Sequence, residues 1–114
     1  MRLVFIELPL FTAQITTLDC DHWLNRLQDD LLKQPDKGDL IPRLLGLRKV
    51  RMALPGTGKR GGARVIYLHL RNHQAILFFY IYTKAESVNL TPDQERRLQT
   101  AVKTIKSEFR HEKP

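Results

Sequence analysis

Apolar positions in the first part of the chain predict one short strand followed by two helices. Residues 2–7 are rich in branched and aromatic side chains, which is typical of a strand, and 9–18 predicts a short helix. From 23 to 32, tryptophan and leucine side chains recur at helical spacing, and Pro35 stops this second helix. A turn-rich connection over 35–46 follows.

The middle of the chain predicts three consecutive strands. Residues 47–53 alternate, so that Arg48, Val50 and Met52 point one way while Leu47, Lys49, Arg51 and Ala53 point the other. A glycine-rich loop over 55–62 precedes a strand over 63–70, and a tight polar connection over 71–74 follows. Residues 75–83 are apolar at nearly every position, which predicts a central strand covered on both faces.

A long helix ends the chain. Thr91-Pro92-Asp93-Gln94 has the form of a capping box with proline at the first helical position. An apolar stripe then follows at helical spacing: Leu98, Val102, Ile105 and Phe109.

This order of elements predicts the fold class. Short links between the last three strands favour an antiparallel meander, and helices packed on one face of that sheet would give an α+β domain. The 114 residues contain no linker or repeat, so we expect a single domain over 1–114.

Composition places the protein in a reducing compartment. Cys20 is the only cysteine, which excludes an internal disulfide. The chain has no apolar run of membrane-spanning length, and Glu7 interrupts its first apolar segment, so we expect no N-terminal signal peptide. We therefore expect a soluble, cytoplasmic protein with no membrane partner.

Positive charge is concentrated in the middle of the chain. Residues 40–85 contain nine Lys and Arg but no Asp or Glu, whereas the two flanks together hold ten basic and twelve acidic residues. A soluble protein normally intersperses its charges, since unrelieved like charge is destabilising. The block therefore indicates a polyanionic partner, with nucleic acid as the first candidate and an acidic protein as the second.

Four residues from separate segments are candidates for a shared basic surface. Lys49 and Arg51 lie on one face of a strand, Arg64 opens the next strand, and Lys84 follows the end of the third, just after Tyr82 and Thr83. A meander would bring them together beside aromatic side chains, as suits single-stranded RNA. The alternative is a solvated sheet face with incidental charge.

The glycine-rich loop is not a nucleotide-binding P-loop. That motif needs a glycine five residues before Gly58 and Ser or Thr after the lysine, and the chain has Ala53 and Arg60 there. Lys59 and Arg60 could still approach phosphate groups, although a plain hairpin loop is an equal alternative.

The missing carboxylates favour RNA chemistry that needs no metal. Nucleases that use Mg²⁺ hold it with Asp or Glu, and the basic centre has neither, so we expect no metal and no other cofactor. In RNA the 2′-hydroxyl is a built-in nucleophile, which requires a base, a cation for the phosphorane and an acid. Arg64 suits the cation. The candidates for phosphate contact or proton transfer are Lys49, Lys59, Lys84, Tyr82 and Tyr67.

Histidine and cysteine are weaker candidates for this chemistry. His69 and His73 lie at the far end of their strand from Arg64, while His22 belongs to a helix and His111 to the tail. We expect surface or structural roles for all four, and an inert Cys20 with no basic activator.

Three segments resemble the RelE-type toxins, and most closely a HigB-like branch. They are 46–51 (Gly-Leu-Arg-Lys-Val-Arg), 58–67 (Gly-Lys-Arg-Gly-Gly-Ala-Arg-Val-Ile-Tyr) and 81–84 (Ile-Tyr-Thr-Lys), of which the second is the most specific. The resemblance implies a small α+β ribonuclease-toxin fold with an antiparallel sheet and a C-terminal helix. One departure is Ala85, where several such toxins have a second basic residue.

The resemblance also implies an activity and partners. Such toxins bind the A site of the 70S ribosome and cut mRNA there by 2′-hydroxyl attack, without metal. A cognate antitoxin, typically with a helix-turn-helix, holds them inactive and carries the pair to operator DNA. The residues to which the resemblance assigns roles are Lys49, Arg51, Lys59, Arg60, Arg64, Tyr82 and Lys84. Altogether we expect catalysis from Arg64, Lys84, Tyr82 and Lys49, and RNA binding from Arg48, Arg51, Lys59, Arg60 and Tyr67.

Two other functions are compatible with the same sequence. A ParE-like relative would bind DNA gyrase and cleave no RNA, since a shared fold does not fix function. A nucleic-acid-binding module without catalysis would need only the basic centre. The dense cluster around Arg64 and Lys84 favours cleavage, because a gyrase binder does not require a surface that stabilises phosphate.

Overall fold

The computed structural model describes residues 2–54, 62–83 and 89–111. Within them the elements follow in the order β1 (Val4–Glu7), α1 (Pro9–Leu18), α2 (Asp21–Lys33), β2 (Asp39–Leu40), β3 (Arg48–Met52), β4 (Ala63–Leu70), the 3₁₀ turn η1 (Arg71–His73), β5 (Ala75–Thr83) and α3 (Pro92–His111). The predicted helices and long strands are therefore confirmed, and β2 is an addition within the connection expected over 35–46.

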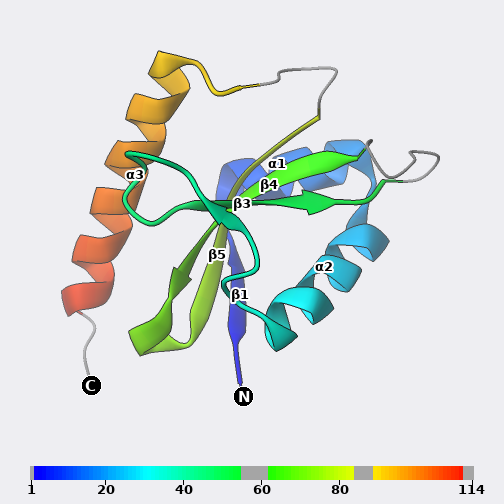
Figure 1. The fold of residues 1–114 in the computed structure, drawn as a ribbon, viewed down its shortest axis with the longest axis horizontal. Coiled ribbons are helices and arrows are strands. Elements are labelled where there is room, and N and C mark those ends of the chain that lie inside the picture. Colours follow the sequence, from blue (N-terminus) through cyan, green and yellow to red (C-terminus); the bar gives the residue numbers. More distant parts are fainter. Residues whose placement is uncertain (1, 55–61, 84–88, 112–114) are drawn as a thin grey trace.

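The strands form one sheet in the order β1-β5-β4-β3-β2 (Figure 1). The expected meander is present, because β3 pairs antiparallel with β4 and β4 with β5. β1 pairs parallel with β5, so the first strand closes the side of the sheet opposite β2. β5 is an inner strand, as its apolar sequence predicts, although β4 lies in the middle.

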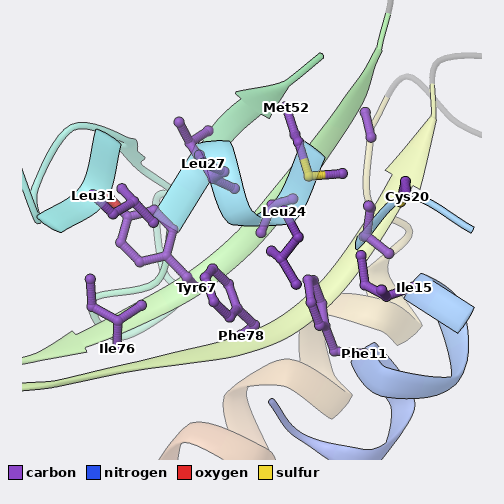
Figure 2. Close-up of a cluster of buried hydrophobic side chains, with 14 residues drawn as sticks. Phe11, Ile15, Cys20, Leu24, Leu27, Leu31, Met52, Tyr67, Ile76 and Phe78 are labelled. Carbon is purple, nitrogen blue, oxygen red and sulfur yellow. The ribbon is translucent and has the colours of Figure 1, made fainter. Parts of the chain in front are cut away.

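Helices α1 and α2 cover one face of the sheet. Figure 2 shows the aromatic and leucine side chains that fill this layer, with Phe11 of α1 stacked on Phe78 of β5 at 5.1 Å between ring centroids. Leu24, Leu27 and Leu31 of α2 are buried in the same cluster. This layer holds α1 and α2 against one face of the sheet and leaves the opposite face for other side chains.

The second face packs against α3, so the expectation that all helices lie on one face is wrong. Val102 of α3 is fully buried among Ile66, Leu77 and Phe79, and Leu44 of the 41–47 segment belongs to the same cluster. The physical reason is β5 itself, since a strand that is apolar on both sides must be covered on both. The domain is α+β with three layers.

The start of α3 is the capping box that the sequence predicts. The backbone N–H of Gln94 donates to Thr91 Oγ1 at 3.1 Å, and the N–H of Thr91 donates to Gln94 Oε1 at 2.8 Å. Two amide hydrogens that would otherwise lack partners are thereby satisfied. None of the helices in the described segments is both long and apolar enough to cross a bilayer.

Candidate functional site

Strand register brings two arginines and a tyrosine into one row. Arg51 of β3 pairs with Arg64 of β4, and Arg64 pairs in turn with Tyr82 of β5. Residues directly opposite one another in neighbouring strands project from the same face, with Cβ atoms about 5 Å apart. Segments far apart in the sequence therefore place two arginines and a tyrosine in one row across the sheet, and the charge of Arg64 acts on Tyr82.

The next row on the same face adds an amine and a second tyrosine. Lys49 pairs with Ile66, and Ile66 pairs with Tyr80, two residues along each strand from the first row. Ile66 is fully buried and forms an apolar floor between them. We call this surface the basic face, and it consists of Lys49, Arg51, Arg64, Tyr80 and Tyr82.

A bulge in β5 aims both tyrosines at this face. The register shifts between Ile66 and Tyr67, which leaves Phe79 without a partner on β4. Phe78 packs toward α1, whereas Phe79 and the following Tyr80 both pack on the side of α3. Under strict alternation Tyr80 would lie on the side of Phe78, so the extra residue determines where the phenols point.

The cations of the basic face are positioned to meet an anion. Lys49 and Arg51 are exposed, and Arg64 is half-buried with a guanidinium nitrogen 3.4 Å from the carbonyl oxygen of Ala63. Among the residues of known position, neither Lys49 nor Arg64 forms a salt bridge with a carboxylate. The positive charge of Arg64 is therefore available to a phosphate group, whereas Lys49 shares its row with Asp39 of β2, its direct partner across the strands.

Tyr82 is suited to donating a hydrogen bond rather than to accepting a proton. The side chain is 4% exposed, and its ring centroid lies 6.0 Å from that of Tyr80. Burial raises the pKa of Tyr82 above its usual value of 10.0, against the opposing charge of Arg64, and Tyr80 adds to the rise. The phenol is therefore protonated at neutral pH and can donate a hydrogen bond.

Arg48 and Tyr67 do not join the basic face, so the expectation that they contact RNA does not fit their positions. They pair with each other on the opposite side of the sheet. Tyr67 is fully buried, donates to Pro35 O at 2.8 Å and accepts from the N–H of Gly38 at 2.9 Å. Arg48 donates to Gly38 O at 2.7 Å. Both side chains hold the turn between α2 and β2 against the sheet.

An ion cluster around Asp36, which sequence reasoning missed, completes this attachment. The carboxylate lies 2.9 Å from His69 Nδ1 and 3.5 Å from Arg48 Nε, and it also pairs with Arg71. Burial acts to raise the pKa of Asp36, but the hydrogen bond and charge of His69 and the charges of both arginines outweigh it and lower the pKa. His69 therefore has a structural role.

The other candidate residues either have structural contacts or lie outside the described residues. His73 Nε2 lies 3.2 Å from the carbonyl oxygen of Phe109, and the ring of His22 contacts Trp23 edge-on. Cys20 is buried, and its pKa is raised by burial and by neighbouring aspartates, which fits an unreactive thiol. The expected RNA contacts Lys59, Arg60 and Lys84 lie outside the described residues.

Comparison with known families decides the group to which this arrangement belongs. A family model described as the RelE toxin of the RelE/RelB toxin–antitoxin system matches residues 39–112. The chain belongs to the RelE toxin family. The match runs from β2 through α3 and includes the whole basic face, while β1, α1 and α2 precede it. Membership implies an antitoxin partner, and the predicted resemblance to RelE-type toxins is confirmed.

Proposed function

We propose that this RelE-family protein is an endoribonuclease toxin that cuts mRNA in the ribosomal A site and so stops translation. The observation that carries the proposal is the row formed by Arg51, Arg64 and Tyr82. Two guanidinium groups beside a neutral phenol supply charge stabilisation and a hydrogen donor at one place. The antitoxin holds the toxin inactive in the cytoplasm and links it to operator DNA.

The reaction begins with attack of the RNA 2′-hydroxyl on the adjacent phosphorus. The 2′-hydroxyl releases its proton to water as it attacks, and the bond from phosphorus to the 5′-oxygen breaks. The leaving 5′-oxygen takes up a proton, so the products are a 2′,3′-cyclic phosphate on one fragment and a 5′-hydroxyl on the other. Arg64 binds the phosphoryl oxygens as negative charge builds on them, and Arg51 adds to that stabilisation. The attacking 2′-oxygen and the leaving 5′-oxygen both belong to the RNA, so no metal is needed to generate a nucleophile.

Individual proton transfers are assigned by protonation state. Tyr82 remains neutral, so it serves as the donor to the leaving 5′-oxygen rather than as the base. Lys49 is exposed at the edge of the same face and contacts phosphate, as does Lys84, the residue that follows β5 in the sequence. Lys59 and Arg60 are proposed as further RNA contacts from the loop between β3 and β4.

The test is Arg64→Ala, with Arg43→Ala as its matched control. Arg43 belongs to the same basic stretch, but it is exposed, pairs with Glu95 of α3 and belongs to neither row of the basic face. Primer extension on a translated message after induction should show discrete cuts for wild type and Arg43→Ala and none for Arg64→Ala. Antitoxin affinity should be the same for all three proteins.

Two results would contradict the proposal. Undiminished cutting by Arg64→Ala would remove the arginine from the reaction. Growth arrest by the wild type with no cuts in any message would point instead to a gyrase-binding toxin, and inhibition of purified gyrase would then identify it.

A further inference from the structure

The side chain of Gln94 connects the start of α3 to the basic face. Its Oε1 accepts the backbone N–H of Thr91 at 2.8 Å, and its Nε2 lies 3.2 Å from the hydroxyl oxygen of Tyr80. One amide group therefore serves two purposes, because the same side chain caps a helix and contacts a tyrosine on β5. Only the capping role is apparent from the sequence.

The capping role also fixes the direction of the second hydrogen bond. A backbone N–H can only donate, so the Gln94 atom that faces Thr91 must be the amide oxygen. The atom that faces Tyr80 is then the NH₂ group, which can only donate. Tyr80 accepts this bond through its oxygen, and its own hydroxyl hydrogen points to a different acceptor.

The position of Tyr80 on the basic face places its hydroxyl hydrogen within reach of an RNA strand bound there. Tyr80 is half-buried, whereas Tyr82 is almost completely buried, and the two rings are 6.0 Å apart. Tyr80 also borders a groove of about 310 Å³ between the start of α1 and α3, so one side of the residue is open. An RNA strand bound at Arg64 reaches the row of Tyr80 one step along the sheet.

We infer that Tyr80 donates a hydrogen bond to the bound RNA and that Gln94 is the positioning residue that keeps this hydrogen available. The inference rests on the proposed function and adds a residue to its site. A glutamate at position 94 provides a sharp contrast. Its carboxylate would retain the capping box but would accept the Tyr80 hydrogen and turn it away from the RNA.

The experiment measures the single-turnover cleavage rate of ribosome-bound mRNA by purified variants. Tyr80→Phe should lose about ten-fold or more in rate, the size expected for a hydrogen bond to a charged group. Gln94→Glu should lose a similar factor while its thermal midpoint stays at the wild-type value, because an acidic side chain suits the first turn of a helix. The double variant should be no slower than Tyr80→Phe alone.

Gln99→Glu is the matched control, since it makes the same chemical change on the same helix. Gln99 donates to Arg43 O at 2.8 Å rather than to a residue of the basic face, so this variant should cleave at the wild-type rate. A purely structural effect of charge on α3 would instead slow both glutamate variants equally.

Several outcomes would overturn the inference. Wild-type rates for either Tyr80→Phe or Gln94→Glu would do so, as would equal losses in the two glutamate variants or a double variant whose loss is the product of the single losses. In each case cleavage that still depends on Arg64 would leave the proposed function in place. A wild-type protein that leaves ribosome-bound mRNA intact would defeat both.

Discussion

Replacing Tyr67 with phenylalanine should destabilise the protein without impairing cleavage. The change keeps the ring in its fully buried position and deletes only the hydroxyl, which bonds Pro35 O at 2.8 Å and the Gly38 N–H at 2.9 Å. The N–H belongs to a buried glycine and loses its partner there, which costs about 1–2 kcal/mol. The carbonyl of Pro35 is half-exposed and can recruit water, so about 1 kcal/mol is appropriate for it.

The total loss of about 2–3 kcal/mol is large enough to measure. Urea unfolding at equilibrium should show it as a lower midpoint with an unchanged slope, and the thermal midpoint should fall by roughly 10 °C. Tyr80→Phe is the matched control, because its hydroxyl makes one bond from a half-exposed position and should cost less than about 1 kcal/mol. A loss below about 0.5 kcal/mol in Tyr67→Phe, or slower cleavage by this variant at full stability, would refute the structural role.

Three further predictions follow from local geometry. Gly62→Ala should lower the free energy of unfolding by about 2 kcal/mol or more, because a Cβ would lie 2.4 Å from Met52 O at a φ of +95°. Gly46→Ala should lose only about 1 kcal/mol in the same urea titration, because its φ is +101° but a Cβ would come no closer than 3.6 Å, to Leu68 Cδ1. Asp36→Asn should make the free energy of unfolding depend less on pH in acid. The lowered pKa of Asp36 in the folded protein contributes stability above the usual pKa of 3.8, and this stability disappears as the pH falls through the pKa of the folded state. In urea titrations, wild type should therefore lose more stability than the variant between pH 4 and pH 2. Burial raises the pKa of both Tyr67 and Tyr82, so phenolate absorbance should show two groups titrating above the usual 10.0, of which one disappears in Tyr82→Phe. A midpoint near pH 7 for the group lost in that variant would restore Tyr82 as a base.

Much of the fold could be predicted because it is encoded in local patterns. The bounds of β4, β5 and α1 coincide with the predicted strands and short helix, since each is a compact apolar run between turn residues. The alternation along β3 also separates Lys49 and Arg51 from Arg48 correctly. The alternation alone excludes Arg48 from the basic face, so it does not support the expectation that Arg48 contacts RNA.

The features that escaped prediction depend on contacts between distant residues. The bulge at Phe79 reverses the facing of Tyr80 and Tyr82, and no residue type in β5 marks it, because its neighbours are all apolar or aromatic. The burial of Tyr67 arises from the turn at 35–38, which is about thirty residues away in the chain. Gln94 is readable as a helix cap, but its second bond requires α3 to lie across β5.

The most direct test of the central claim is to remove the nucleophile from the RNA. A message with a single 2′-deoxynucleotide immediately 5′ of a mapped cut is bound to ribosomes and treated with the purified toxin. Cleavage by 2′-hydroxyl attack predicts that this cut vanishes while cuts at unmodified positions persist and leave 2′,3′-cyclic phosphate ends. Undiminished cleavage at the deoxy position would contradict the account, because Arg51, Arg64 and Tyr82 would then be assisting some other nucleophile.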